Sequence, residues 1–66
     1  MTNEQAKAAE QVFRSIGYDV TAQPSRIARL GWELVGKASD GGKPFYGFSA
    51  NDMKLLVGAG RIAKVS

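Results

Sequence analysis

Catalytic chemistry in this 66-residue chain would have to come from carboxylates, amines and hydroxyl groups, because the sequence contains no histidine and no cysteine. Those two residue types supply many of the general bases, nucleophiles and zinc ligands of enzymes. The six carboxylates are Glu4, Glu10, Asp19, Glu33, Asp40 and Asp52. Glu4 and Asp52 fit the first turns of predicted helices, and Asp40 fits a turn. No pair is spaced for acid–base catalysis, so we expect a protein that is not an enzyme and holds no cofactor and no metal ion.

Two glycine motifs could in principle hold a phosphate group. One is Asp40-Gly41-Gly42-Lys43, and the other is Gly58-Ala59-Gly60. A phosphate loop requires a strand, then a glycine-rich loop, then the N-terminus of a helix. The first motif joins two predicted strands and the second follows a predicted helix. Both are therefore better explained as a turn and a helix end.

The segment Lys43-Pro44-Phe45-Tyr46-Gly47-Phe48 resembles an RNA-recognition strand, in which a basic residue precedes aromatic residues that stack on bases. The likeness covers this segment alone, and no companion motif lies near the first predicted strand. We therefore favour the interpretation that Tyr46 and Phe48 belong to the core.

The N-terminal segment has the pattern of a capped amphipathic helix. Thr2 and Gln5 form a capping-box pattern. The apolar positions that recur at helical spacing, and that we expect to face the core, are Ala9, Val12, Phe13 and Ile16. Gly17 suits the left-handed position that ends a helix, with Tyr18 packing back against the last turn.

The middle of the chain allows two interpretations. Residues 18–24 predict a short strand that ends at a proline, and residues 26–30 predict a helical turn. The alternative is one helix over residues 25–37, whose apolar positions also fit a helical face. Two glycines inside that helix would each cost about 1 kcal/mol relative to alanine. We therefore prefer a strand over residues 32–39.

A β-hairpin is predicted by the turn sequence Asp40-Gly41-Gly42 and the aromatic strand at residues 44–48 that follows it. A three-residue loop pairs Ser39 with Lys43, whereas a two-residue loop would reverse the faces of the second strand. The residues expected on the buried face are then Trp32, Leu34, Tyr46 and Phe48. The opposite face carries our candidate partner-binding residues, which are Val35, Lys37, Lys43 and Phe45. An equal alternative is that another element or a dimer partner covers Phe45.

A second helix is predicted over residues 49–57, with Ser49 as its N-cap and Asp52 in its first turn. Glycines then end this helix, and the alternation of residues 61–65 predicts a last strand. We expect one α+β domain over residues 1–66. In it, two helices pack on one face of a small antiparallel sheet that contains a central β-hairpin.

The net charge of +3 is concentrated in residues 24–66, which hold seven basic and three acidic residues. This distribution favours an anionic partner. A nucleic-acid surface would use these basic residues together: Arg26, Arg29, Lys37, Lys43, Lys54, Arg61 and Lys64.

Two functions fit these observations. The first is a small non-enzymatic protein that docks on a larger protein or nucleoprotein complex and modulates or inhibits it. Phage and mobile-element inhibitors of host defence, anti-CRISPR proteins among them, are often of this size. The alternative is a small basic DNA- or RNA-binding regulator, and a homodimer that pairs strands through residues 61–65 is a further alternative. The lack of cysteine and of long apolar runs predicts a cytoplasmic protein without a membrane partner.

Overall fold

The first helix, α1 (Asn3–Ser15), begins at the predicted capping box. The computed structural model, which describes residues 1–27, 29 and 31–65, shows both bonds of this motif. The backbone N–H of Gln5 donates to Thr2 Oγ1 at 3.1 Å, and the backbone N–H of Thr2 donates to Gln5 Oε1 at 3.0 Å. Two of the N–H groups that a helix start leaves without partners are thereby satisfied.

The end of α1 is also set by local chemistry. Gly17 has a φ of 97°, in the left-handed region that glycine adopts without strain. The N–H of Gly17 donates to the carbonyl of Arg14, and that of Tyr18 donates to the carbonyl of Phe13, each at 3.0 Å. These two bonds form a Schellman motif. The predicted end of the helix is confirmed.

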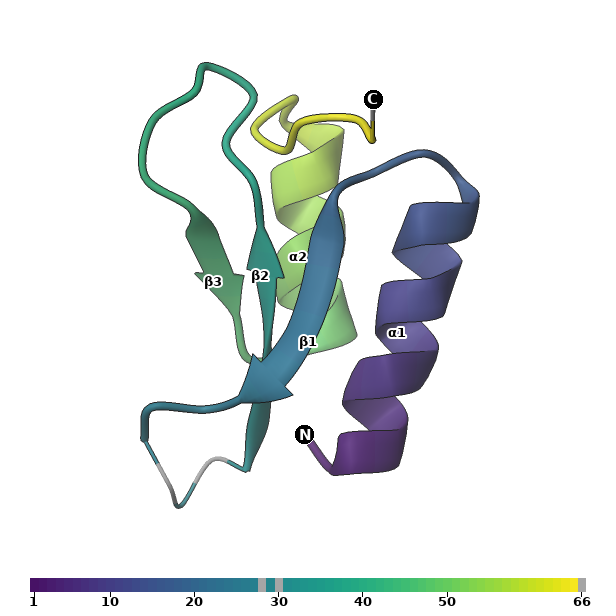
Figure 1. Ribbon diagram of the computed structural model, residues 1–66, viewed down its shortest axis with the longest axis vertical. Helices are drawn as coiled ribbons and strands as arrows, with labels where there is room; N and C mark the ends of the chain where they lie inside the picture. The colour runs from purple at the N-terminus through teal and green to yellow at the C-terminus, as the bar shows by residue number, and fades with distance from the viewer. Residues whose placement is uncertain (28, 30, 66) are drawn as a thin grey trace.

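Three antiparallel strands follow in the order β1 (Val20–Pro24), β2 (Trp32–Gly36) and β3 (Phe45–Gly47), with β2 in the centre (Figure 1). The first strand ends at the proline, as predicted, and β2 confirms a strand in preference to a long helix. The predicted helical turn at residues 26–30 includes Ala28 and Leu30, which lie outside the described residues.

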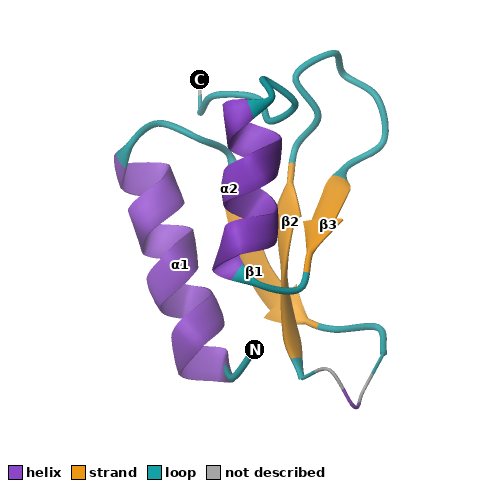
Figure 2. Ribbon diagram, turned by 180° about the vertical axis from the view of Figure 1, so that it is seen from behind, coloured by secondary structure: helices purple, strands orange, loops and turns teal. Residues whose placement is uncertain are grey.

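The second helix, α2 (Ala50–Gly58), starts at Ser49, whose Oγ accepts from the backbone N–H of Asp52 at 3.1 Å. Both helices lie on the same face of the sheet (Figure 2). Helix α1 packs on β1 and β2, and α2 packs on β3 and β2. The predicted α+β fold, with two helices on one face of an antiparallel sheet, is confirmed.

The predicted register of the hairpin is wrong by one residue. Gly36 pairs with Phe45, and Leu34 pairs with Gly47, where the sequence led us to expect Tyr46 and Phe48. The cause is a longer connection between the strands, over residues 37–44. The chain stops pairing with β3 after Gly36, the last residue of β2, and the backbone of Lys37 and Ser39 bonds to the C-terminal segment instead. The faces of β3 are therefore reversed.

The C-terminal residues 61–65 do not form the predicted strand but make two isolated bridges, Ala38 with Ile62 and Tyr18 with Lys64. The backbone N–H of Ala63 donates to the carbonyl of Lys37, and its own carbonyl accepts from Asp19. The segment thus bridges the residues just before β1 and the residues just after β2. Within the chain, the backbone N–H groups of Arg61, Ala63 and Val65 donate to the carbonyls of Leu56, Lys37 and Gly17.

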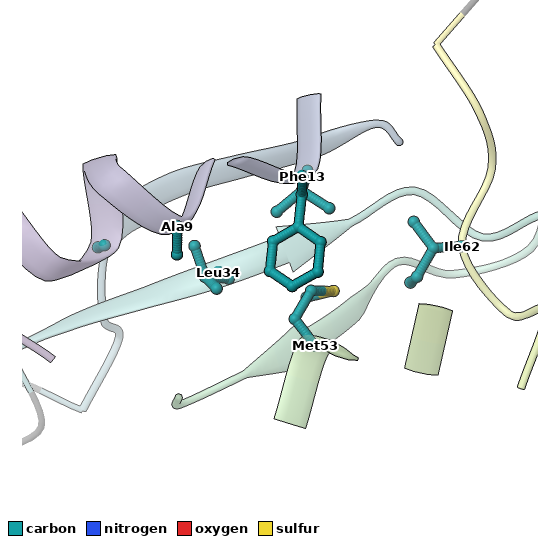
Figure 3. Close-up of a cluster of buried hydrophobic side chains, with 7 residues drawn as sticks. Ala9, Phe13, Leu34, Met53 and Ile62 are labelled. Atoms are coloured by element: carbon teal, nitrogen blue, oxygen red, sulfur yellow. The ribbon is translucent and has the colours of Figure 1, made fainter. Parts of the chain in front are cut away.

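The core lies between the sheet and the two helices. Phe13 of α1, Leu34 of β2, Met53 of α2 and Ile62 of the C-terminal segment converge there (Figure 3). Trp32 and Phe45 are partly buried against this cluster. Side chains from both helices, the central strand and the C-terminal segment therefore meet at the centre of the domain.

Candidate docking groove between the two helices

The two helices leave a groove between them on the side away from the sheet. They run in the same direction (Figure 1), and each contacts its own edge of the sheet. The first part of the groove has a volume of about 620 Å³ and is lined by Met1, Gln5, Ala8, Ala9, Val12, Phe48, Ser49 and Ala50. The adjoining part, of about 400 Å³, is lined by Ala9, Val12, Phe13, Ile16, Ala50, Asn51 and Lys54. We call these residues together the inter-helix groove.

The lining of the inter-helix groove is mostly apolar, although it faces solvent. Val12 and Ile16 each keep 59% of their surface exposed, and Phe48 keeps 42%. Lys54 is the one charged side chain among the described lining residues. Single exposed apolar residues are ordinary, but a group of them around a concavity indicates a contact surface.

Only part of this site was predictable from the sequence. We expected Val12 and Ile16 to lie in the core, but the α1 residues that are buried against the sheet are Ala6, Ala9 and Phe13. The apolar stripe of α1 is wider than its contact with the sheet. Phe48 was also expected in the core, but it lies beyond the end of β3, in the connection to α2, where it lines the groove. The stripe could have indicated the groove, had the packing of α1 been known.

The four predicted partner-binding residues do not share one surface. Phe45 is on the helix-covered face of the sheet and packs against the core, which agrees with the alternative that another element covers it. Val35 is half-buried on the opposite face, Lys37 is exposed just beyond β2, and Lys43 is exposed in the connection to β3. The structure therefore does not form the predicted patch around Phe45.

The open face of the sheet is partly covered by its own side chains. Tyr46 was expected in the core but keeps 37% of its surface exposed. The Arg26 guanidinium lies over its ring, 4.2 Å from the ring centroid. Glu33 is only 1% exposed, and its Oε2 accepts a 2.6 Å hydrogen bond from Gln23 Nε2. Because Arg26 occupies a face of the ring, Tyr46 is not a free platform for base stacking.

The basic residues considered for nucleic-acid binding are distributed over the molecule. Arg26 and Arg29 lie in the connection between β1 and β2 at one end (Figure 1). Arg61 and Lys64 lie in the C-terminal segment at the other end, and Lys54 lines the inter-helix groove between them. The structure does not bring these five residues together on one surface.

Residues 1–27, 29 and 31–65 contain no group of three or more acidic, histidine or cysteine side chains placed to hold a metal ion. None of the helices formed by these residues combines the length and the apolar character needed to span a lipid bilayer. Comparisons of the chain with models of known protein families, with curated protein sequences and with solved structures gave no match.

Proposed function

We propose that this protein is a non-enzymatic binding protein that docks on another protein through the inter-helix groove. The observation that carries the proposal is the concave apolar lining, in which Val12, Ile16 and Phe48 remain exposed. Exposed apolar surface is costly in water at roughly 25 cal/mol per Å². A partner that covers these side chains recovers that free energy and gains shape complementarity.

Binding of this kind is sufficient to modulate or inhibit a larger partner, because an occupied surface is closed to other molecules. A 66-residue chain without histidine or cysteine suits that role, which needs a surface and no reaction. Inhibitors that phages and mobile elements direct at host defence belong to this functional class. A reducing, cytoplasmic location is part of the same proposal, because the fold is held together without disulfides.

Nucleic-acid binding has less support. A phosphate-binding surface needs several cations within reach of one backbone, whereas the connection between β1 and β2, which carries Arg26 and Arg29, lies at the opposite end of the molecule from the C-terminal segment, which carries Arg61 and Lys64 (Figure 1). The Arg26 guanidinium also lies over the ring of Tyr46, 4.2 Å from its centroid.

Site-specific photo-cross-linking tests the proposed function. A photoreactive amino acid replaces Val12 in one variant and Lys43 in another, and each variant is irradiated in an extract of the source cells. We expect discrete protein adducts from position 12, competed by an excess of the unmodified protein, and no such adducts from position 43, which lies outside the groove. Adducts from position 43 alone, or from neither position, would contradict docking through the groove.

A further inference from the structure

The outer edge of β1 is the longer of the two strand edges at the sides of the sheet, because β1 has five residues and β3 has three. A free strand edge is a template for pairing with another chain, so folded proteins block such edges. We infer that two side chains of α1, Glu10 and Arg14, close the β1 edge to strand addition by any other chain, a second copy included. We call these two side chains the edge cover. This inference is independent of docking through the inter-helix groove.

The backbone groups that point outward from β1 belong to alternate residues. In an antiparallel pair, the residues of one strand point their N–H and C=O groups toward and away from the neighbour in turn. The carbonyl of Asp19 accepts from the N–H of Lys37, and the N–H of Ser25 donates to the carbonyl of Gly31. The odd-numbered residues of this stretch therefore bond toward β2. The outward positions are Val20, Ala22 and Pro24.

All residues of β1 are described, and none of its three outward positions has a free N–H group. The N–H of Val20 donates to the carbonyl of Tyr18 at 3.1 Å, and a proline such as Pro24 has no N–H. The N–H of Ala22 donates to Glu10 Oε2 at 2.8 Å. A carboxylate is a stronger acceptor than the carbonyl of an added strand. Another strand laid along β1 would find no donor while Glu10 holds Ala22.

Arg14 covers the same edge one helical turn further along α1. Val20 and Ala22 pack on the helix-covered face of the sheet, so Thr21 between them lies on the open face. Arg14 Nη2 nevertheless donates to Thr21 Oγ1 at 3.0 Å and to Asp19 Oδ1 at 3.2 Å. A side chain that starts on α1 and ends on the open face passes over the edge of β1. Its charge and bulk exclude an incoming strand.

The two side chains of the edge cover are spaced to pair with each other but bind the strand instead. A glutamate and an arginine four residues apart on a helix are neighbours, close enough to form an ion pair. Arg14 forms its salt bridge with Asp19, and Glu10 accepts from the backbone of Ala22. The contacts of the pair therefore serve the edge of β1 and not the surface of the helix.

The other side of the sheet is blocked by the same kinds of groups. β3 begins directly after Pro44, which has no N–H group. The N–H of Phe48, directly after β3, donates to Asp52 Oδ2 at 3.1 Å. A proline at one end and a helix carboxylate at the other shorten the stretch with which another strand could pair. A partner is thus left with side-chain surfaces and not with strand edges.

Removing the edge cover at constant net charge tests this inference. The double variant Glu10→Ala/Arg14→Ala should self-associate in sedimentation velocity at concentrations where the unchanged protein does not. The matched control Glu4→Ala/Lys7→Ala removes the same charges from the same helix, where Lys7 lies over Trp32 of β2 and not at the β1 edge. Glu10→Gln keeps an oxygen acceptor for the N–H of Ala22. Both of these variants should sediment like the unchanged protein, and self-association of either one would overturn the inference.

Hydrogen exchange of the Ala22 amide shows whether the new contact is at the β1 edge. In the dilute double variant this amide should exchange about tenfold faster than in the unchanged protein, because its charged acceptor is gone. Raising the concentration should slow the exchange again, since an added strand supplies a carbonyl. A double variant that stays monomeric, or that associates without protecting Ala22, would overturn the inference. If circular dichroism shows the double variant unfolded, Glu10→Ala alone is measured in the same way. Neither Glu10 nor Arg14 lines the inter-helix groove, so these results leave the docking proposal to its own test.

Discussion

At the scale of single residues, Gly36 is a position where the core leaves no room for a side chain. A Cβ atom at this position would lie 2.5 Å from Ile62 Cδ1 and 3.0 Å from Met53 Sδ. The glycine therefore lets the C-terminal segment and α2 reach the sheet. We predict that Gly36→Ala lowers the free energy of unfolding by about 1–3 kcal/mol, the usual cost of an overpacked core, as measured by urea denaturation.

A double-mutant cycle separates this clash from a general loss of packing. Ile62→Val removes the Cδ1 atom that the new methyl group would meet, at a cost of about 0.5–1.5 kcal/mol by itself. The double variant Gly36→Ala/Ile62→Val should consequently lose less stability than the sum of the two single changes. Strictly additive losses would show that this contact is not the source of the cost.

At the scale of elements, the glycines at the C-terminal ends of α1 and α2 have opposite effects on stability. Gly17 has a φ of 97°, and a Cβ there would meet no atom within 4 Å, so its role is conformational. We predict that Gly17→Ala costs about 1–2 kcal/mol, because an alanine in the left-handed region is strained. Gly58 is in the last turn of α2 without a positive φ. Gly58→Ala should stabilise the protein by up to about 1 kcal/mol.

The two alanine variants serve as controls for each other in thermal unfolding. Neither new methyl group would meet an atom within 4 Å, so a common packing effect does not apply to them. A midpoint that does not fall in Gly17→Ala would show that backbone conformation at Gly17 does not limit stability, and a midpoint that falls in Gly58→Ala would contradict the prediction for Gly58.

The helix ends were predictable from sequence because the interactions that set them are local. The capping box joins Thr2 and Gln5, and the Schellman bonds join residues within one turn of each other. The register of β3 was not predictable in the same way. It depends on Ser39, whose N–H donates to the carbonyl of Arg61, far away in the chain. Loop length alone predicted a register that is shifted by one residue. Phe45 therefore lies on the helix-covered face of the sheet and not on the open face, where it was expected.

The groove illustrates the same limit at the level of one helix face. Helical spacing correctly grouped Val12, Phe13 and Ile16 as one stripe, but it could not say how much of that stripe the sheet would cover. Phe13 is buried in the core, whereas Val12 and Ile16 remain exposed beside it. The position of α2, which forms the other wall, is a property of the tertiary structure.

At the scale of the whole molecule, the fold does not use all the apolar surface that the sequence supplies. A domain of this size buries only about 60% of the surface that its unfolded chain exposes. The described core is held by residues from both helices, two strands and the C-terminal segment. Val12 and Ile16 are outside that core, so their apolar side chains need an explanation other than folding.

The last prediction tests that explanation directly. The double variant Val12→Gln/Ile16→Gln should change the free energy of unfolding by no more than about 0.5 kcal/mol per site, because both side chains are largely exposed. Phe13→Ala, on the same helix but buried, should cost about 3–5 kcal/mol. Urea denaturation measures both variants, and binding of an apolar dye should fall only in the first. If the double variant instead loses as much stability as Phe13→Ala, the stripe serves the fold. That result would contradict the proposal that the inter-helix groove is a docking surface.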